Sequence, residues 1–513
     1  MRGADQDTRR RRAAVPLTVA AVIAMAIAQP APSLARGAVS SGAAPVAKTA
    51  PPPSSRRGGP VSVTVEPGTA IGPVVPSDFL GLSFEASSLH TIAGYASSGD
   101  FVNLLRSLGP GVMRFGGISA DESTAWLQEG LAPAWAQATI VPQDLAALAV
   151  LARETGWRVL LTVNLAHSEA AAAAQEAKMA QAQLGPSLAG IAIGNEPDRY
   201  VADGLRPAGW TQTAYLAEAG AYRGAIAAAA PGVPIAGPDV SSGRLLLGWV
   251  TDLASAERPA LLTDHFYPLT KCGDHRVTLG ELVSPLTRRN ETTTLARLAA
   301  IEQASTVPLR VDETNNVSCR GQPGVSNVFA SSLWAVDYLA RAMASGLAGV
   351  NLHDLITEPQ AYSPLVAEGA SGLASGALQA DPEWYALLLA HHLLGDRPVS
   401  ASVAARSRDV TAAAFLNPSG SLEIVLVNFA GEASKPLGVR LHLPRTLSAG
   451  PILRLTAPTL RARTHVLLGG RGVSSAGTWS HVTPLPLVSG KPGSLELSMP
   501  AGSAALVTLY SRG

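Results

Sequence analysis

The chain has 513 residues, which is enough for a large core and for more than one domain. Its 39 basic residues nearly balance its 38 acidic ones, so the sequence indicates no polybasic face and disfavours nucleic acid as a partner. The hydrophobic fraction of 47% is typical of a globular protein.

The N-terminus is predicted to be a targeting signal that lies outside the fold. The basic segment Arg9–Arg12 precedes a short apolar segment, Ala13–Ala28, and small residues at Ser33–Ala35 suit cleavage. The arginines also fit a twin-arginine signal. A retained membrane anchor is the alternative, which the short apolar run and Pro16 disfavour. We therefore predict a signal peptide over residues 1–35, a secreted or periplasmic protein, and no membrane span after its removal.

The next two segments precede the main domain. Residues 36–59 are rich in Ala, Pro and Ser, so they cannot bury a core and are predicted to be a disordered linker. Val61–Glu66 alternates apolar and polar residues, which is the period of a half-buried strand. Because this strand has no place in the repeating pattern that follows, we predict that residues 60–75 join a C-terminal β-domain.

Residues 76–395 alternate short apolar runs with helical segments. The runs are continuous, as expected for strands buried on both faces, and comprise Phe79–Phe84, Gly111–Phe115, Arg158–Val163, Leu188–Ile193, Val233–Ala236, Leu261–Phe266, Leu309–Val311 and Gly349–His353. The predicted helices include Gln143–Thr155, Ser168–Gln183, Thr211–Ala229, Asn327–Ser345 and, as the last, Glu383–Gly395. This alternation predicts the α/β fold class and a (β/α)8, or TIM, barrel. A doubly wound open sheet is disfavoured because Gly81–Ala86 contains no Gly-rich phosphate turn.

Residues 396–513 have a different composition and are predicted to form a β-sandwich. The predicted strands are Val410–Leu416, Leu422–Asn428, Val439–Leu443, Leu495–Met499 and Ala504–Tyr510. Between the first two, Asn417–Gly420 contains Pro and Gly, which favour the backbone angles of a hairpin turn.

Two glutamates stand at the ends of apolar runs. Glu196 follows the fourth run and Glu313 follows the seventh, and these strands lie on opposite sides of an eight-stranded barrel. Their carboxyl groups can therefore face each other across its mouth, as the acid and the nucleophile of a glycosidase do. The alternative is that each carboxyl caps a neighbouring element.

Five segments carry a family resemblance: "GLSFEASSL", "VMRFGGISAD", "IAIGNEPD", "DHFYP" and "VDETNNVSCRGQPGVSNVFASSLWAVDYLARA". In this order they resemble the heparanase and β-glucuronidase family, glycoside hydrolase family 79, whose members also carry a β-sandwich. The resemblance implies a retaining enzyme in which Glu196 is the acid/base and Glu313 is the nucleophile. Chemistry agrees, because the acid needs a raised pKa and the nucleophile must be ionised.

Further residues are candidates for binding the substrate or the nucleophile. Tyr267, after the sixth run, is placed to donate a hydrogen bond to the nucleophile, unless it is a packed core aromatic. Arg114, at the end of the second run, is expected to add positive charge nearby, either in contact with the substrate or in a structural ion pair. The resemblance implies that Asn195 bonds the sugar 2-hydroxyl, that Glu85 accepts from a sugar hydroxyl, and that Tyr362 holds a uronate carboxylate. The alternatives are a turn-forming Asn, a solvated charge and surface packing, respectively.

Export also bears on the two cysteines, Cys272 and Cys319. Both follow predicted barrel strands, so a disulfide on one face is expected, with two free thiols as the alternative. No His or Cys cluster has the spacing of metal ligands, so neither a metal nor a cofactor is expected.

The sequence is compatible with three functions. The first is hydrolysis of a β-linked glucuronide in a glycan or glycoside. The second applies the same mechanism to a neutral sugar, as a β-glucosidase, β-xylosidase or α-L-arabinofuranosidase. The third is a non-catalytic exported carbohydrate-binding protein, which the presence of both carboxyls disfavours. A cluster of donors for a uronate carboxylate would distinguish the first two. Lys271 and Arg320 lie in suitable loops, with solvated surface charges as the equal alternative.

Overall fold

The computed structural model describes residues 59–241, 246–359, 361–404, 409–444, 447–480, 485–486 and 493–511. The predicted signal peptide and all but the last residue of the predicted linker lie outside this part of the chain. Within it, every helix is too short or too polar to cross a membrane.

Eight parallel strands close into a barrel in the order β11-β13-β2-β3-β6-β7-β8-β9. They are β2 (Leu80–Glu85), β3 (Val112–Gly116), β6 (Arg158–Val163), β7 (Leu188–Ile193), β8 (Ile235–Val240), β9 (Leu261–Phe266), β11 (Leu309–Thr314) and β13 (Gly349–His353). Each contains or overlaps one of the predicted apolar runs. The last strand pairs with the first in register from Val350 opposite Leu80, which closes the barrel. The prediction of a TIM barrel is confirmed, and the open-sheet alternative is wrong.

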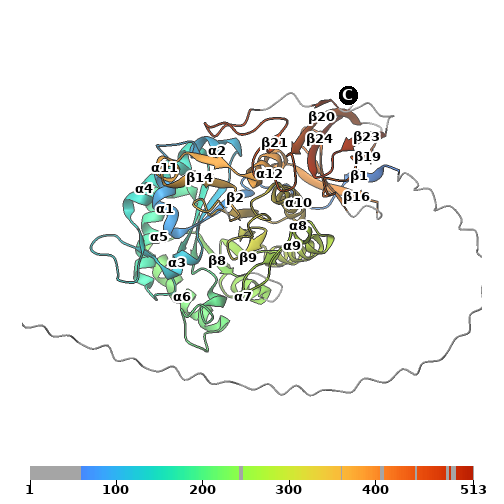
Figure 1. Cartoon of the computed structure of the whole chain (residues 1–513). Helices are drawn as coiled ribbons and strands as arrows, with labels where there is room; N and C mark the ends of the chain where they lie inside the picture. Colours follow the sequence, from blue (N-terminus) through green and yellow to red (C-terminus); the bar gives the residue numbers. More distant parts are fainter. Residues whose placement is uncertain are drawn as a thin grey trace, which may run out of the picture. The chain divides into compact units, whose positions relative to one another are not determined.

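Helices connect and flank the barrel strands (Figure 1). They are α1 (Leu89–Gly94), α2 (Phe101–Ser107), α3 (Ile118–Glu122), α4 (Pro142–Thr155), α5 (Ala170–Leu184), α6 (Gln212–Ala229), α7 (Leu247–Glu257), α8 (Leu279–Leu282), α9 (Pro285–Ser305), α10 (Phe329–Ser345), α11 (Gly369–Ser375) and α12 (Pro382–Ala390). Capping side chains fix the N-termini of several of these helices. The hydroxyl of Thr211 accepts from the backbone N–H of Ala214 before α6, and Ser284 caps α9 ahead of a proline in its first turn.

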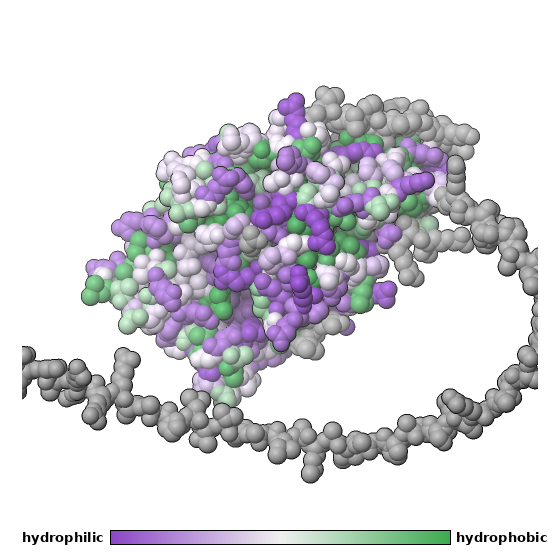
Figure 2. Space-filling view, in the orientation of Figure 1, coloured by the Kyte–Doolittle hydropathy of each residue, from purple (hydrophilic) through white to green (hydrophobic). Residues whose placement is uncertain are grey.

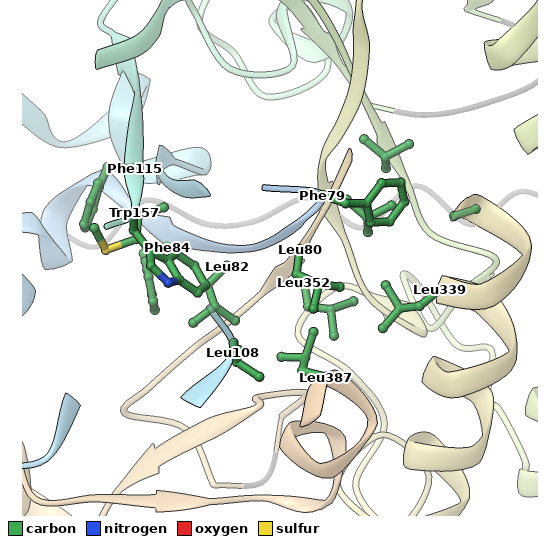
Figure 3. Packing of buried hydrophobic residues seen from close by; sticks show 14 of the residues in the cluster. Phe79, Leu80, Leu82, Phe84, Leu108, Phe115, Trp157, Leu339, Leu352 and Leu387 are labelled. Carbon is green, nitrogen blue, oxygen red and sulfur yellow. The ribbon is translucent and has the colours of Figure 1, made fainter. Parts of the chain in front are cut away.

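The barrel strands face two environments, which alternate along each strand. In β2, Leu80, Leu82 and Phe84 belong to the main apolar core. Figure 3 shows Leu82 and Phe84 on the side of Trp157, whereas Leu352, Leu339 and Leu387 gather near Leu80. Ser83, in contrast, faces the barrel interior, where Arg114 from β3 donates a hydrogen bond to its hydroxyl. The helix-facing side of the strands therefore supplies the packing, while the interior side can carry polar chemistry.

A second sheet of ten strands contains the first strand of the fold and the C-terminal strands. Its order is β21-β20-β24-β18-β17-β16-β1-β19-β23, with β22 paired to β20. The bounds are β1 (Val61–Ala70), β16 (Arg397–Val403), β17 (Val410–Leu416), β18 (Leu422–Asn428), β19 (Leu437–His442), β20 (Leu447–Thr456), β21 (Leu467–Leu468), β22 (Leu485–Pro486), β23 (Ser494–Met499) and β24 (Ser503–Ser511). β1 lies between β16, to which it is antiparallel, and β19, to which it is parallel. Strands β16 and β20 were not predicted, because Pro398 and the Gly450–Pro451 pair interrupt their strand patterns.

The two faces of this sheet have separate roles. In β18, Ile424 and Leu426 belong to a core that includes residues from β23, at one end of the strand order, and from β20, next to the other end, so the sheet folds over on itself as a sandwich. The alternate residues, Val425 and Val427, belong to the main core together with α10 and α12. The sandwich is thus attached to the helices of the barrel through an apolar contact. On the face shown in Figure 2, hydrophilic and hydrophobic residues are mixed rather than gathered into one broad apolar area.

The remaining strands form three pairs. β4 (Thr124–Trp126) pairs with β5 (Ala138–Ile140), β10 (Leu269–Thr270) with β12 (Val317–Ser318), and β14 (Leu365–Ala367) with β15 (Leu378–Ala380). All three pairs lie within segments that follow barrel strands in the sequence.

Removal of β1 is expected to disrupt the second sheet. A chain that starts at residue 75 would lose the strand between β16 and β19, together with the buried side chains of Val63 and Val65. Both neighbouring strands would then expose unpaired edges, so we expect aggregation or a large loss of stability. Solubility and thermal unfolding should be compared with a chain that starts at residue 59. Equal stability of the two chains would contradict the structural role of β1.

Glu176 on α5 is expected to make stability depend on pH. This side chain is buried, one of its carboxylate oxygens has no partner among the described residues, and burial raises its pKa from 4.5 to about 8. The unfolded chain loses this proton near pH 4.5, so the folded state should lose stability as the pH rises from about 4.5 to about 8.

Glu176→Gln cannot ionise and should therefore be more stable than the parent at pH 9, by roughly 2–4 kcal/mol. The difference should shrink below about pH 4.5, where the glutamate is protonated in both states. Urea unfolding at both pH values measures it. Glu154→Gln, at an exposed ion pair with Arg106, is the control and should change little. An unchanged pH dependence in Glu176→Gln would contradict the prediction.

Candidate active site

Polar side chains meet at the carboxyl ends of the barrel strands. Six strands or the segments directly after them supply Glu85 (β2), Arg114 (β3), Glu196 (after β7), Asp239 (β8), His265 (β9) and the pair Asp312 and Glu313 (β11), and β13 adds His353. The parallel topology puts all of these ends at one face, which is where TIM-barrel enzymes carry their sites.

Arg114 holds the centre of this cluster. Its Nη1 donates to Glu313 Oε2 at 2.6 Å, and its Nη2 donates to Asn195 Oδ1 at 2.8 Å and to Asp239 Oδ2 at 3.0 Å. Its Nε lies 3.1 Å from Asp312 Oδ2. Burial would lower the pKa of Arg114, but the surrounding carboxylates raise it above its ordinary value. The guanidinium is therefore charged, and since it is fully buried, the structural ion pair fits it better than the predicted contact with substrate.

Glu313 is turned toward the cluster by a β-bulge. Val311 pairs with Asp264 and Glu313 pairs with His265, so Asp312 is an extra residue in β11. A bulge re-aims the side chains around it. Both Asp312 and Glu313 consequently approach Arg114, although neighbours in a regular strand point to opposite faces.

The surroundings of Glu313 favour its ionised form. Tyr267 donates its hydroxyl to Glu313 Oε1 at 2.9 Å, as the sequence predicted. Burial alone would raise the pKa of Glu313, but the positive fields of His353, His265 and Arg114, with the Tyr267 hydrogen bond, hold it well below its usual range. This side chain is therefore an anion at neutral pH.

Glu196 has the opposite electrostatic character. Its backbone adopts a left-handed conformation, with φ of 48°, and its N–H donates to the carbonyl of Asp239 at 2.8 Å. Burial raises the pKa of Glu196, and the charge of Glu313 raises it further, against the lowering effect of a hydrogen bond with His265. The side chain of Glu196 is 24% exposed, compared with 10% for Glu313. Glu196 thus has the proton affinity and the access to solvent that a general acid needs.

His265 lies between the two glutamates. Its Nδ1 is 3.1 Å from Glu196 Oε1 and 4.0 Å from Glu313 Oε2. Burial would lower the pKa of His265, but the charge of Glu313 and the bond to Glu196 outweigh it and raise this pKa to about 10. His265 lies in the "DHFYP" segment, but no role was predicted for it from the sequence. Asp312 and His353, at the ends of apolar runs, and Asp239, three residues after one, were not predicted either.

The two carboxyl groups are close together. One oxygen of Glu196, one of Glu313 and a ring nitrogen of His265 all lie within 4.8 Å of one another. Atoms of Asp239, His265 and Asp312 form a second group of this kind. Such groups are able to hold a metal ion, but here the Arg114 guanidinium already contacts both aspartates and Glu313. The absence of a metal stays a prediction from the sequence.

Glu85 is linked to Glu313 through His353, whose Nδ1 lies 3.7 Å from Glu313 Oε2. Glu85 Oε2 accepts from the backbone N–H of Ser119 at 2.9 Å, and its Oε1 is 3.7 Å from His353 Nε2. Burial would raise the pKa of Glu85, but His353 and Ser119 lower it, so the carboxylate is charged and able to accept from a hydroxyl. Gly117 makes this contact possible, because a Cβ at that position would lie 2.6 Å from the Glu85 carboxyl.

Tyr362 reaches the site through Tyr267. The two hydroxyls are 3.3 Å apart and the rings are 5.8 Å apart, and Tyr362 is buried. The hydroxyl of Tyr267 thus connects Tyr362 with Glu313, and Tyr362 is a buried residue rather than a surface one. Of the two cations that the sequence singled out, Arg320 is exposed and paired with Glu358, and Lys271 is half-buried.

A disulfide joins the loops that follow β9 and β11. Cys272 and Cys319 are bonded, with their Cα atoms 5.5 Å apart, which confirms the predicted pairing. The bond lies directly after the small parallel pair of β10 and β12. Tyr267 precedes β10 by two residues, so the disulfide ties the loop of Tyr267, which donates to Glu313, to the chain that follows Glu313.

Replacement of both cysteines by serine is expected to weaken the fold and the site together. Opening a loop with a sequence separation of 47 should cost roughly 2–4 kcal/mol of unfolding free energy. The hydrogen bond from Tyr267 to Glu313 should also weaken. We therefore expect kcat to fall even at a temperature where the variant is fully folded. Ser318→Ala, beside the same bond, is the matched control. Unchanged unfolding and unchanged kcat in the double variant would contradict this role.

Comparison with known proteins identifies the fold. No family model matches the chain, and no curated protein sequence matches it. Solved structures match it with low sequence identity. A 4-O-α-L-rhamnosyl-β-D-glucuronidase from Fusarium oxysporum 12S has a TM-score of 0.69 at 18% identity, over 87% of this chain and 100% of that one.

Two further matches have other specificities. A family 51 arabinofuranosidase from Xanthomonas axonopodis pv. citri has a TM-score of 0.63 at 15% identity, over 88% of this chain and 100% of that one. The catalytic domain of a family 30 xylanase from Talaromyces cellulolyticus has a TM-score of 0.53 at 14% identity, with the same coverage. The chain therefore has the fold of TIM-barrel glycoside hydrolases, and the neighbours include several sugar specificities.

Proposed function

We propose that this protein is a retaining β-glucuronidase that acts on glucuronic-acid-containing glycans or glycosides. The observation that carries the glycosidase assignment is the pair of unlike carboxyls: an ionised Glu313 and a Glu196 of raised pKa, with oxygens within 4.8 Å of each other. Retaining enzymes hold their carboxyls about 5 Å apart, whereas inverting enzymes need roughly 6.5–9.5 Å to admit a water.

The chemistry follows from these positions. Glu313 attacks the anomeric carbon while Glu196 gives its proton to the leaving oxygen, which produces a covalent glycosyl-enzyme. Glu196 then removes a proton from water, and the water releases the sugar with its original configuration. In this proposal Asn195, whose amide oxygen accepts from Arg114, bonds the 2-hydroxyl, and Glu85 accepts from another hydroxyl. The disulfide supports an oxidising, extracytoplasmic location.

The choice of glucuronide rests on the five family 79 segments, on Tyr362 and on the likeness to the Fusarium glucuronidase. Tyr362 is buried beside Tyr267, and since Tyr267 gives its proton to Glu313, the hydroxyl of Tyr362 is the donor of the 3.3 Å bond between them. In this proposal a bound uronate takes over that proton, so Tyr362 supplies a neutral donor. A neutral donor can bond a carboxylate without the desolvation that a buried cation requires.

A neutral-sugar specificity is the second candidate, and a specific observation favours it. Arg320 is bound by Glu358 rather than directed at the cluster, and Arg199 is paired with Asp203 at 3.0 Å and with Glu196 at 3.7 Å. A site whose nearby cations are already paired also suits an uncharged sugar, as in the matching arabinofuranosidases.

A panel of 4-nitrophenyl glycosides decides between these candidates. We expect kcat/KM for the β-D-glucuronide to exceed that for the β-D-glucoside, β-D-xyloside and α-L-arabinofuranoside by at least about 100-fold, since one lost polar contact costs roughly that much. The first sugar released should be the β-anomer by NMR. Preference for a neutral glycoside would replace the sugar assignment, release of the α-anomer would overturn retention, and binding without turnover would favour a carbohydrate-binding protein.

A further inference from the structure

Asp121, on α3, is a buried carboxylate outside the pair that performs the chemistry. It is 1% exposed and accepts four hydrogen bonds. Oδ1 accepts from the backbone N–H groups of Leu165 at 2.7 Å and Ala166 at 3.1 Å. Oδ2 accepts from the N–H of Asn195 at 2.6 Å and from the hydroxyl of Tyr200 at 2.5 Å. Burial raises the pKa of Asp121, against the lowering effect of these four bonds. Because both oxygens only accept, the geometry fits the carboxylate form, whose hydrogen bonds are shorter and stronger than those of a neutral group.

These bonds join the segments that follow three neighbouring barrel strands. α3 follows β3, Leu165 follows β6 and Asn195 follows β7, and these three strands are adjacent in the barrel. Asn164 adds a second connection, since its Nδ2 donates to the carbonyls of Ala120 at 2.8 Å and Asp121 at 3.0 Å. The backbone of Asp121 is therefore fixed by Asn164, so its carboxylate can in turn fix the segments that donate to it.

Two of the four bonds grip the chain on either side of Glu196. Asn195 immediately precedes Glu196, and Tyr200 ends the short helical turn, Pro197–Arg199, that Glu196 begins. Glu196 needs this support because its φ of 48° is unfavourable for a residue with a side chain. In the described part of the chain, no hydrogen bond joins Asp121 to β11, the strand of Glu313.

We propose that Asp121 is the positioning residue of the acid/base, acting on Glu196 and not on the nucleophile. This role rests on the proposed function. Asp121 sets the backbone of Glu196 so that its carboxyl meets both the leaving oxygen and His265. Its loss should therefore impair proton transfer selectively and leave the attack by Glu313 intact.

Asp121→Asn tests this role with little change in shape. An asparagine has one acceptor oxygen, so two of the four donors would face an NH2 group instead of an acceptor. We expect kcat/KM to fall about 100-fold for an alkyl glycoside, which needs protonation, and less than about 5-fold for a 2,4-dinitrophenyl glycoside, which does not. The slope of log kcat/KM against the leaving-group pKa should become steeper. Tyr200→Phe removes one bond only and should shift the slope in the same direction by a smaller amount.

Asp144→Asn is the matched control. Asp144 is also buried and accepts from the N–H of Val141, but it caps α4. The substitution Asp144→Asn should lower stability without changing the slope of log kcat/KM against the leaving-group pKa. An equal loss for both substrates in Asp121→Asn and in Tyr200→Phe would overturn the positioning role. If Asp121→Asn does not fold, the slope of Tyr200→Phe decides alone. A parent protein that hydrolyses none of the glycosides overturns the proposed function itself, a result distinct from an active enzyme whose slope does not change.

Discussion

Glu313→Gln should abolish turnover of every substrate, with a fall in kcat of roughly 10⁴–10⁶-fold, the range seen when a covalent nucleophile is removed. The amide cannot form the glycosyl-enzyme, so an activated leaving group should not restore the rate. Turnover of aryl glycosides with good and poor leaving groups measures this result.

The contacts of Glu313 indicate that its variants should still fold. Glu313→Gln removes one of three carboxylates around Arg114, and Asp239 and Asp312 remain to balance it. The variant should therefore fold, which thermal unfolding can verify. Glu313→Gly with azide should convert a β-aryl glycoside into the α-azide, because the small anion attacks from the side that the nucleophile occupied. Full activity of Glu313→Gln, or formation of the β-azide by Glu313→Gly, would remove Glu313 from this role.

Glu196→Ala should be selective in its effect. Substrates with poor leaving groups need a proton and should lose about 10²–10⁴-fold in rate. An activated aryl glycoside should still form the covalent intermediate, which then accumulates because no base remains to activate water. Added azide should restore turnover and yield the β-azide. NMR of the azide product and a burst of released phenol are the measurements.

The pH profile gives an independent check on Glu196. The general acid must be protonated, so activity of the parent enzyme should fall as pH rises through the raised pKa of Glu196. Glu196→Ala should lose this alkaline limb for the activated substrate. Glu169→Ala, the control, lies just before α5 and should keep the whole profile. An α-azide product from Glu196→Ala, or an unchanged alkaline limb, would reverse the assignment of the two glutamates.

The barrel was predictable because its signal is local and repeated. Strands such as β2 place apolar residues, for example Leu80 and Leu82, against the helices. The apolar runs stay recognisable in the sequence although they include polar residues that face the barrel interior. Glu196 and Glu313 were recognisable as candidates for the same reason, since a carboxyl within a few residues of the end of an apolar run lies at the rim of the barrel. The disulfide followed from two cysteines that come after neighbouring strands.

The tertiary structure decided what depends on distance between segments far apart in the chain. Only the closed barrel brings Arg114 to Glu313, which follows it by 199 residues, and forms the buried ion pair, one of the two roles that the sequence left open. The bulge at Asp312 and the left-handed backbone of Glu196 are backbone geometries that the strand pattern does not encode. The unequal pKa values of the two glutamates arise from burial and from the fields of His265, His353 and Arg114, and these fields exist only after folding. The sequence by itself therefore determined the architecture and the two candidate carboxyls, whereas the three-dimensional arrangement determined which of them favours a proton and which favours a charge.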